Sequence, residues 1–273
     1  MFNFQKILDF LIPRRCAGCG KSNEAFCAVC RASSSQNSSG CLLCGFRNDT
    51  GEFCKDCRRK SDFLMEVGLP STLKSVFWAG RYDEALKKAV WELKYGKRRE
   101  LARPLAEMLA EKFAMFCENS RQASILEDLA QRDGASRAIR QQADMRVLQN
   151  AALVGNFITI PIPLHFKRQY ERGFNQAELL AKEFSKITGI AMRNDILKKI
   201  KETPAQVEVQ NKELRLKNLG DAFQISLSNP IAKWPTIILI DDVSTTGATL
   251  MHAADALKKS GAKNITGLVV AHG

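Results

Sequence analysis

Residues 236–250, TIILIDDVSTTGATL, constrain the fold of this chain more than any other stretch. The apolar, β-branched run 236–240 has the length and composition of a buried parallel strand. Two adjacent carboxylates, Asp241 and Asp242, end this run, and small hydroxyl residues lead from them into a helical pattern. The sequence therefore predicts a strand, a short loop and the start of a helix.

The loop between this strand and this helix has the composition of a phosphate site. Free backbone N–H groups and the positive end of the helix dipole favour an anion at a helix N-terminus. Because carboxylates repel phosphate, Asp241 and Asp242 should face sugar hydroxyls or a magnesium ion on the same ligand. The ligand class that fits is a sugar phosphate. The residues that would hold its phosphate are Ser244, Thr245, Thr246, Gly247, Ala248 and Thr249.

The pattern of a hydrophobic strand, Asp-Asp-Val and Thr-Thr-Gly-Ala-Thr resembles the loop with which type I phosphoribosyltransferases bind phosphoribosyl pyrophosphate (PRPP). The resemblance implies that Asp241 and Asp242 hold the ribose 2′ and 3′ hydroxyls, while residues 244–249 hold the 5′-phosphate. A Walker loop is excluded, because the Gly-Lys-Ser/Thr signature is missing. The remaining alternative is a coincidental Asp-Asp at a strand end, as in a phosphoacceptor or metal site.

Four Cys-x-x-Cys pairs near the N-terminus predict a zinc module. Two such pairs complete one tetrahedral site, so the module should hold two structural zinc ions. Sequential pairing is favoured because the polar stretch 32–40 looks like a linker, but an interleaved arrangement that joins the first pair with the third stays open. A disulfide framework and an iron–sulfur cluster are weaker alternatives, since nothing suggests secretion. The cysteines are Cys16, Cys19, Cys27, Cys30, Cys41, Cys44, Cys54 and Cys57.

The composition predicts a globular chain that prefers anionic partners. Apolar residues make up 45% of the 273 positions, enough for a sizeable core. No apolar run approaches the ~18 residues of a membrane span, and the N-terminus lacks the features of a signal peptide, so we expect a cytoplasmic protein. The formal net charge of +12 fits PRPP, pyrophosphate or nucleic acid, although a basic surface kept for solubility would give the same number.

Three basic stretches are candidates for the charged side of the site. Arg168 and Arg172 follow an apolar strand at 157–163, in a loop ahead of a predicted helix, which suits binding of a diphosphate. The segment 194–223, with Lys199 and Lys201, has weak periodicity and resembles a lid that closes over a charged reaction. The densest basic cluster, at 87–99, could hold single-stranded DNA together with the zinc ribbons.

The order and spacing of these pieces resemble the ComF family. Besides the cysteine pairs and the PRPP loop, the pattern includes Leu-Lys-Tyr at 93–95 and the block from Pro161 to Gln176. It implies an α/β fold like that of type I phosphoribosyltransferases, with a mostly parallel sheet and helices on both faces, over residues 66–273. An N-terminal helix and the double zinc ribbon would occupy residues 1–65. Residues 118–156 are then a polar helical insertion, and His272 stands where an Arg is expected.

The resemblance also implies a function. A phosphoribosyltransferase of this kind would bind PRPP with magnesium, transfer the phosphoribosyl group to an unknown acceptor and work with DNA-uptake proteins in natural transformation. Asp241 and Asp242 would hold the ribose, while Arg168 and Arg172, with Lys201 or Lys199, neutralise the leaving pyrophosphate. The alternative is a non-catalytic accessory protein that binds single-stranded nucleic acid and keeps the PRPP pocket as a sensor or relic.

Overall fold

A computed structural model describes residues 14–21, 24–35, 54–55, 73, 75–130, 157–202, 222–226 and 236–273, with the backbone alone for 118–130. Several sequence-based predictions fall outside these residues: the N-terminal helix, the linker 36–40, most of the second zinc unit, the loop 203–221 and residues 131–156. The elements in chain order are α2 (Ala28–Ser35), β1 (Ser75–Arg81), α5 (Glu84–Lys94), the 3-10 helix η1 (Arg99–Leu101), α6 (Ala102–Ala130), β2 (Phe157–Pro161), α8 (Phe166–Arg172), α9 (Gln176–Thr188), β3 (Leu197–Lys199), β4 (Phe223–Ile225), β5 (Thr236–Ser244), α11 (Ala248–Lys259) and β6 (Asn264–His272).

Four of these strands form one parallel sheet in the order β1-β6-β5-β2. The predicted strand at 236–240 lies inside it, between β6 and β2, and pairs with both. Strands covered on both faces become nearly continuous apolar runs, and β5 and β6 have this composition. The mostly parallel α/β sheet is therefore confirmed, and β3 and β4 form a separate antiparallel pair.

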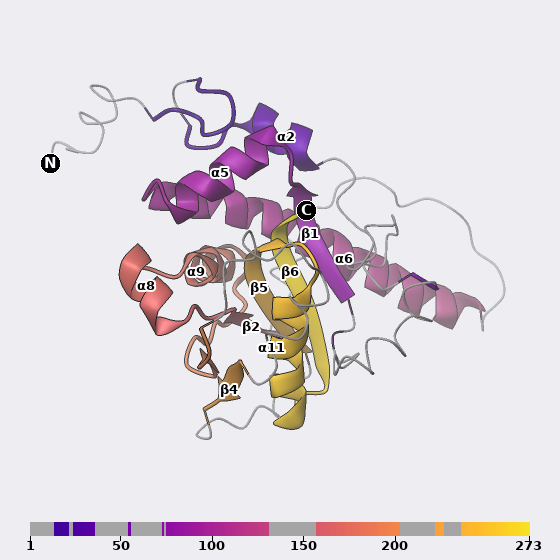
Figure 1. The fold of residues 1–273 in the computed structure, drawn as a ribbon. Helices are drawn as coiled ribbons and strands as arrows, with labels where there is room; N and C mark the ends of the chain where they lie inside the picture. Colours follow the sequence, from indigo (N-terminus) through magenta and orange to yellow (C-terminus); the bar gives the residue numbers. More distant parts are fainter. Residues whose placement is uncertain are drawn as a thin grey trace, which may run out of the picture.

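Helices cover both faces of the sheet (Figure 1). Successive strand residues point to opposite faces, so β5 divides its side chains between two cores. Ile238 and Ile240 pack with residues of α5, α6 and α9, whereas Ile237 and Leu239 pack with residues of α11. All four are fully buried. The carboxyl end of β5 thus rests on packed side chains from both layers, which fixes the residues that follow.

Helix α5 connects the cysteine-rich segment with the sheet. Its buried residues Leu86, Ala89, Val90 and Leu93 recur at helical spacing, and the side chain of Asp83 caps its N-terminus by accepting from the backbone N–H of Leu86 at 2.9 Å. The helix ends at Lys94 and lies beside α2 in Figure 1. It thereby carries Lys94 toward the end of the sheet.

Three element boundaries differ from the sequence-based expectations. Strand β5 continues to Ser244, because β6 runs beside it as far as His272. Beyond Ile240 the two strands share three more register pairs, which involve Asp241, Val243 and Ser244. Arg168 and Arg172 lie on the short helix α8, not in a loop, and Gly173 ends that helix in a left-handed conformation (φ 75°). Helix α6 runs without a break to Ala130, so no element boundary marks the expected start of the insertion at 118.

Candidate active site

Asp241 and Asp242 lie within β5 at the carboxyl end of the parallel sheet. Asp241 pairs in register with Val269 of β6, and Ser244 pairs with His272. In open α/β sheets ligands bind outside the carboxyl ends of the strands, so the acids have the position that a ligand site requires. Ile240 and Leu239, which precede the acids, belong to the two cores on opposite faces of the sheet. The surroundings of each carboxylate follow from its own contacts.

Asp242 forms an ion pair with Lys94, the last residue of α5. Nζ of Lys94 lies 2.9 Å from Oδ2 of Asp242, and the side chains are 21% and 5% exposed. The approach is that of an ion pair rather than of an aligned hydrogen bond. Burial lowers the pKa of Lys94, but the nearby carboxylates of Asp242 and Asp241 outweigh it and raise the pKa. Lys94 thus remains a cation at the strand end.

Asp241 has a different environment and lies under the influence of Lys199. Burial and the negative charge of Asp242 raise the pKa of Asp241 to about 7, against the lowering effect of the Asp242 backbone N–H, Lys94 and Lys199. Lys199 ends β3, where burial lowers its pKa and the charge of Asp241 opposes that change. Its Nζ also lies 5.8 Å from the ring centroid of Phe223. Asp241 is thus a carboxyl whose proton is exchangeable near neutral pH.

The predicted phosphate loop is short in the structure. Only Thr245, Thr246 and Gly247 separate β5 from α11. Gly247 adopts φ 72°, a conformation that favours glycine, and no side chain caps the N-terminus of α11 at this residue. Oγ of Ser244 is buried and has no hydrogen-bond partner within the part of the chain that the structure describes. An unpartnered hydroxyl beside an uncapped helix N-terminus is suited to bind an anion.

Thr246, Ala248 and Thr249, the other residues predicted to bind the phosphate, surround the same turn. The backbone N–H of Ala248 donates to Oγ1 of Thr246 at 3.4 Å, and both residues are buried. Thr249 lies in the first turn of α11. The six predicted loop residues are therefore contiguous at one corner of the fold, where the strand passes into the helix.

The first two cysteine pairs converge on one point. The sulfur atoms of Cys16, Cys19, Cys27 and Cys30 all lie within 4.8 Å of one another. Burial and the three neighbouring thiols raise the pKa of Cys30, as expected where thiolates crowd without a cation. Four such sulfurs fit tetrahedral zinc, whose charge would hold them deprotonated. The cluster supports a structural zinc site, and its membership is that of the sequential pairing.

This zinc unit is packed onto the rest of the chain. Oγ of Ser34 donates to Oδ1 of Asp83, the cap of α5, at 3.0 Å. A guanidinium nitrogen of Arg98 donates to the backbone carbonyl of Arg15 at 2.7 Å. Phe26 is buried in the same apolar core as α5 and α6. The first zinc unit is therefore part of the folded body and not a separate appendage.

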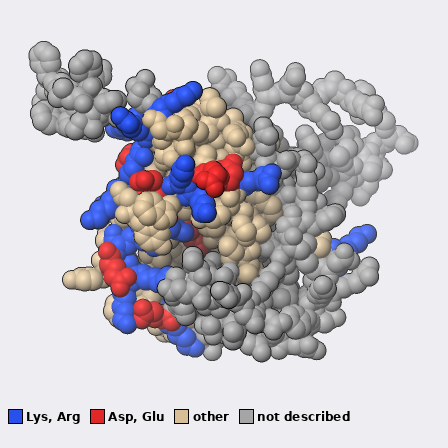
Figure 2. Space-filling view, turned by 45° about the horizontal axis from the view of Figure 1, so that its top comes forward, with Lys and Arg blue, Asp and Glu red and all other residues tan. Residues whose placement is uncertain are grey.

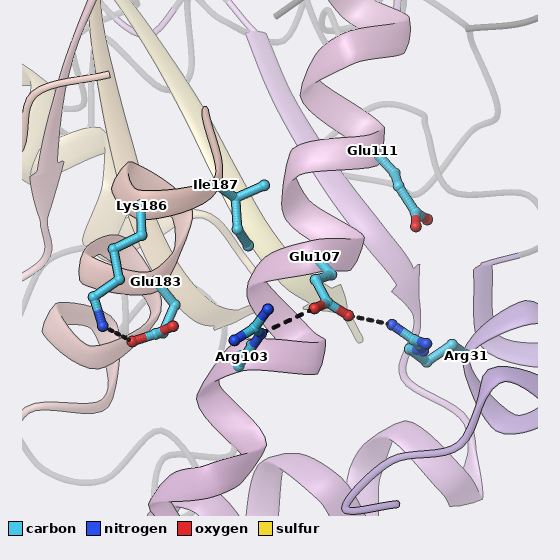
Figure 3. Close-up of a pocket in the computed structure, with 7 residues that line it drawn as sticks. All are labelled: Arg31, Arg103, Glu107, Glu111, Glu183, Lys186 and Ile187. Carbon is cyan, nitrogen blue, oxygen red and sulfur yellow. Dashed lines mark hydrogen bonds and ion pairs between the residues drawn. The ribbon is translucent and has the colours of Figure 1, made fainter. Parts of the chain in front are cut away.

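A groove of about 510 Å³ lies between α2, α6 and α9, away from the acids (Figure 3). Glu107 is bound from both sides, by Arg31 at 2.6 Å and by Arg103 at 3.3 Å, and Lys186 pairs with Glu183 at 2.6 Å. Three cations and three carboxylates line the groove, so it has no net preference for an anion. The ion pair between Arg31 and Glu107 joins α2 to α6, so we interpret the groove as a structural contact between helices. The lining residues are Arg31, Arg103, Glu107, Glu111, Glu183, Lys186 and Ile187.

Comparison with known proteins agrees with both parts of this description. The double zinc ribbon domain model matches residues 7–64. Competence protein F of Haemophilus influenzae is 39% identical over 106 residues, which are 39% of this chain and 46% of that protein. The match thus spans about half of the length of that relative. DNA utilization protein YhgH of Salmonella typhimurium is 25% identical over 245 residues, covering 89% of this chain and 88% of that protein.

Competence protein ComFC of Bacillus subtilis is 24% identical over 245 residues, 88% of this chain and 81% of that protein. These relatives and the double zinc ribbon support a ComF family protein. Its double zinc ribbon and its parallel sheet have the order along the chain that the ComF pattern implied. Among the described helices, none has the length and apolar character needed to cross a membrane.

Two blocks of the ComF pattern meet in space. The guanidinium of Arg172 lies 5.0 Å from the ring centroid of Tyr95 and donates to Oε1 of Gln176. Arg99 lies 4.7 Å from the ring centroid of Phe174. Asn175 caps α9 and donates to the carbonyl of Ile162 at 3.0 Å. Most of these residues hold the segments around the site in place, and Arg172 in particular is engaged by its own neighbours.

One functional side chain, Lys94, was missed as a site residue. The ComF pattern contains Lys94 in its Leu-Lys-Tyr stretch, but no local pattern indicates that this lysine faces Asp242. Lys199 or Lys201 was predicted to bind pyrophosphate; the structure places Lys201 as an exposed residue beyond β3, and the charge of Asp241 acts on Lys199. The alternation in β3, with Leu197 buried, could have indicated that Lys199 points inward.

Proposed function

We propose that this ComF chain binds PRPP at the carboxyl end of β5 and transfers its phosphoribosyl group to an acceptor. The observation that carries the proposal is the corner formed by Asp241, Ser244 and the uncapped N-terminus of α11 at Gly247. It combines a half-buried carboxyl for hydroxyl groups with hydrogen-bond donors for one phosphate. A sugar phosphate offers partners for both kinds of group.

Residues outside this corner take the charge of the leaving group in the proposal. The charges of Arg168 of α8 and of Asp241 both act on the pKa of Lys199 of β3, the first lowering it and the second raising it. As the bond between C1′ and pyrophosphate breaks, negative charge grows on the pyrophosphate oxygens, and prepositioned cations lower its energy. Lys201 follows Lys199 by two residues and remains a second candidate for this role. Arg172 would contribute only if it gave up its contacts with Tyr95 and Gln176 and bound the pyrophosphate instead.

Magnesium belongs to this proposal only as a companion of PRPP. The acids do not offer it a site of two free carboxylates, because Asp242 is already paired with Lys94. Mg²⁺ usually binds through one or two carboxylates and substrate phosphates, where it neutralises part of the phosphate charge. We therefore assign the protein's own residues, and not a resident metal, to the steps above.

Calorimetric titration of PRPP in the presence of Mg²⁺ tests the proposal. Asp241→Asn should weaken PRPP binding by about tenfold, the equivalent of one lost charged hydrogen bond. Asp255→Asn is the matched control, since Asp255 lies on the same helix as the phosphate corner but pairs with Lys259 at 2.8 Å. No saturable binding to the folded, zinc-loaded wild type would contradict the proposal.

The names of the relatives connect the family with competence and DNA utilization, and we propose a role in DNA uptake for this chain as well. A second candidate function, contact with single-stranded DNA, is favoured by a group of exposed aromatic side chains on α5 and α8. Trp91 and Tyr95 lie with ring centroids 5.7 Å apart, and Tyr170 is 89% exposed. Figure 2 shows Lys and Arg side chains along this side of the molecule, with some Asp and Glu among them. Exposed rings among cations suit base stacking.

Fluorescence anisotropy with a labelled oligothymidine would test this second function. Trp91→Ala should weaken binding by about tenfold if one base stacks on this ring. Met115→Ala, which removes another exposed apolar side chain on α6, is the control and should leave the affinity unchanged. Binding that falls with salt but not with Trp91→Ala would indicate a purely electrostatic contact.

A further inference from the structure

Both carboxylate oxygens of Asp242 already have a neighbour within the chain. Oδ2 pairs with Nζ of Lys94 at 2.9 Å, and Oδ1 accepts from the backbone N–H of Val243 at 2.7 Å. The residue is only 3% exposed. A divalent cation at Asp242 would therefore have to displace a lysine that is itself held at the end of a well-packed helix.

Asp241 is partly engaged as well. Its Oδ1 accepts from the backbone N–H of Asp242 at 2.8 Å, which directs this oxygen back toward the strand. The charges of Asp242 and Asp241 both act on Lys94 and raise its pKa. Lys94 thus supplies positive charge to both acids.

We propose that Lys94 is the resident cation of the acid pair, so that Asp242 is neutralised by the chain itself and the site holds no Mg²⁺ of its own. The inference rests on the proposed PRPP pocket and deepens it. A lysine that cancels one of two carboxylate charges lowers the repulsion that a polyanionic ligand would meet. Lys94 is in this sense a positioning residue, which fixes Asp242 and leaves Asp241 to face the ligand.

The test uses Mg²⁺ alone, titrated calorimetrically into three proteins. Wild type should show no saturable binding in the millimolar range that depends on Asp242. Lys94→Met, which keeps the apolar stem and removes the charge, should gain Mg²⁺ binding by at least about tenfold, because the buried carboxylate then lacks a cation. Lys94→Met/Asp242→Asn should lose this gain. Lys88→Met is the matched control on the exposed side of α5 and should behave like wild type.

Two results would overturn the inference: Mg²⁺ binding to wild type that disappears in Asp242→Asn, or a folded Lys94→Met that gains no Mg²⁺ binding. If Lys94→Met does not fold without metal, millimolar Mg²⁺ should restore its folding, and failure to do so also counts against the inference. Lys94→Arg keeps the charge and should exclude Mg²⁺ as wild type does. These measurements use no PRPP. Their results therefore test the role of Lys94 even if the protein does not bind PRPP.

Discussion

Asp241 and Asp242 are neighbours with identical side chains, yet their surroundings give them different chemistry. Asp242 lies 2.9 Å from Nζ of Lys94, whereas burial and the charge of Asp242 raise the pKa of Asp241 to about 7. The cause lies in their contacts, because it is Asp242 that pairs with Lys94. One residue stabilises the strand end, and the other remains available to a ligand.

The raised pKa of Asp241 predicts a pH dependence of stability. The folded chain retains a proton that the unfolded chain loses near its ordinary pKa of about 4, so the stabilisation is complete below about pH 4 and is lost as the pH rises to about 7. Between about pH 5.5 and about pH 8 this residue should lower the free energy of unfolding by about 2 kcal/mol. Urea unfolding of wild type and Asp241→Asn at both values measures the difference, which should shrink in the variant. An equal pH dependence in the two proteins would argue against the raised pKa.

The ion pair between Lys94 and Asp242 predicts a strong energetic coupling. Removal of either partner leaves a buried, uncompensated charge, so each single variant, Lys94→Met or Asp242→Asn, should lose about 3 kcal/mol of unfolding free energy. The double variant should lose less than the sum of the two losses. A double-mutant cycle in urea measures the coupling. Additive losses would show that Lys94 and Asp242 have no energetic coupling.

At the scale of elements, α5 is the connection between the zinc unit and the acid pair. Its N-terminal cap Asp83 accepts from Ser34 of α2, and its last residue pairs with Asp242. The backbone of α2 also lies close to β1, since a Cβ added to Gly80 would come within 2.8 Å of the carbonyl oxygen of Ser34. The arrangement requires the first zinc unit to stay tightly seated on β1 and α5.

This close approach predicts that Gly80→Ala destabilises the protein. The new methyl group meets backbone on one side and Leu86 at 2.9 Å on the other, so we expect a loss of about 2 kcal/mol from overpacking. Gly80→Val should cost more. Thermal unfolding gives the ranking, and an unchanged midpoint for both variants would mean that α2 is not seated as described.

The cysteine cluster predicts the metal content of the chain. Cys16→Ser should reduce the zinc bound per chain from about two ions to about one, because only the first site loses a ligand. The variant should also unfold at lower temperature, since Cys16 and Cys30 belong to the core that holds α5 and α6. Elemental analysis after gel filtration measures the zinc. Loss of both ions at once would contradict the independence of the two sites.

For the molecule as a whole, local patterns predicted the architecture well and the site only in part. The apolar run of β5 identifies a strand of the sheet, and helical spacing identifies α5 through Leu86, Ala89, Val90 and Leu93. Both patterns are local, because each depends on which residues are buried within one element. The meeting of Lys94 with Asp242 joins residues almost 150 positions apart, which no local pattern encodes. The length of β5 depended in the same way on its neighbour β6.

The central claim is that the corner at Ser244 and Gly247 binds the 5′-phosphate of PRPP, and phosphorus NMR tests it most directly. On titration of the zinc-loaded protein into PRPP, the 5′-phosphate resonance should shift and broaden together with those of the pyrophosphate. The shift of the 5′-phosphate should be lost in Gly247→Val, whose side chain strains the left-handed turn. A response of the pyrophosphate resonances alone would indicate that PRPP binds only to a basic surface. That result, or no response at all, would contradict the account of this corner as a PRPP site.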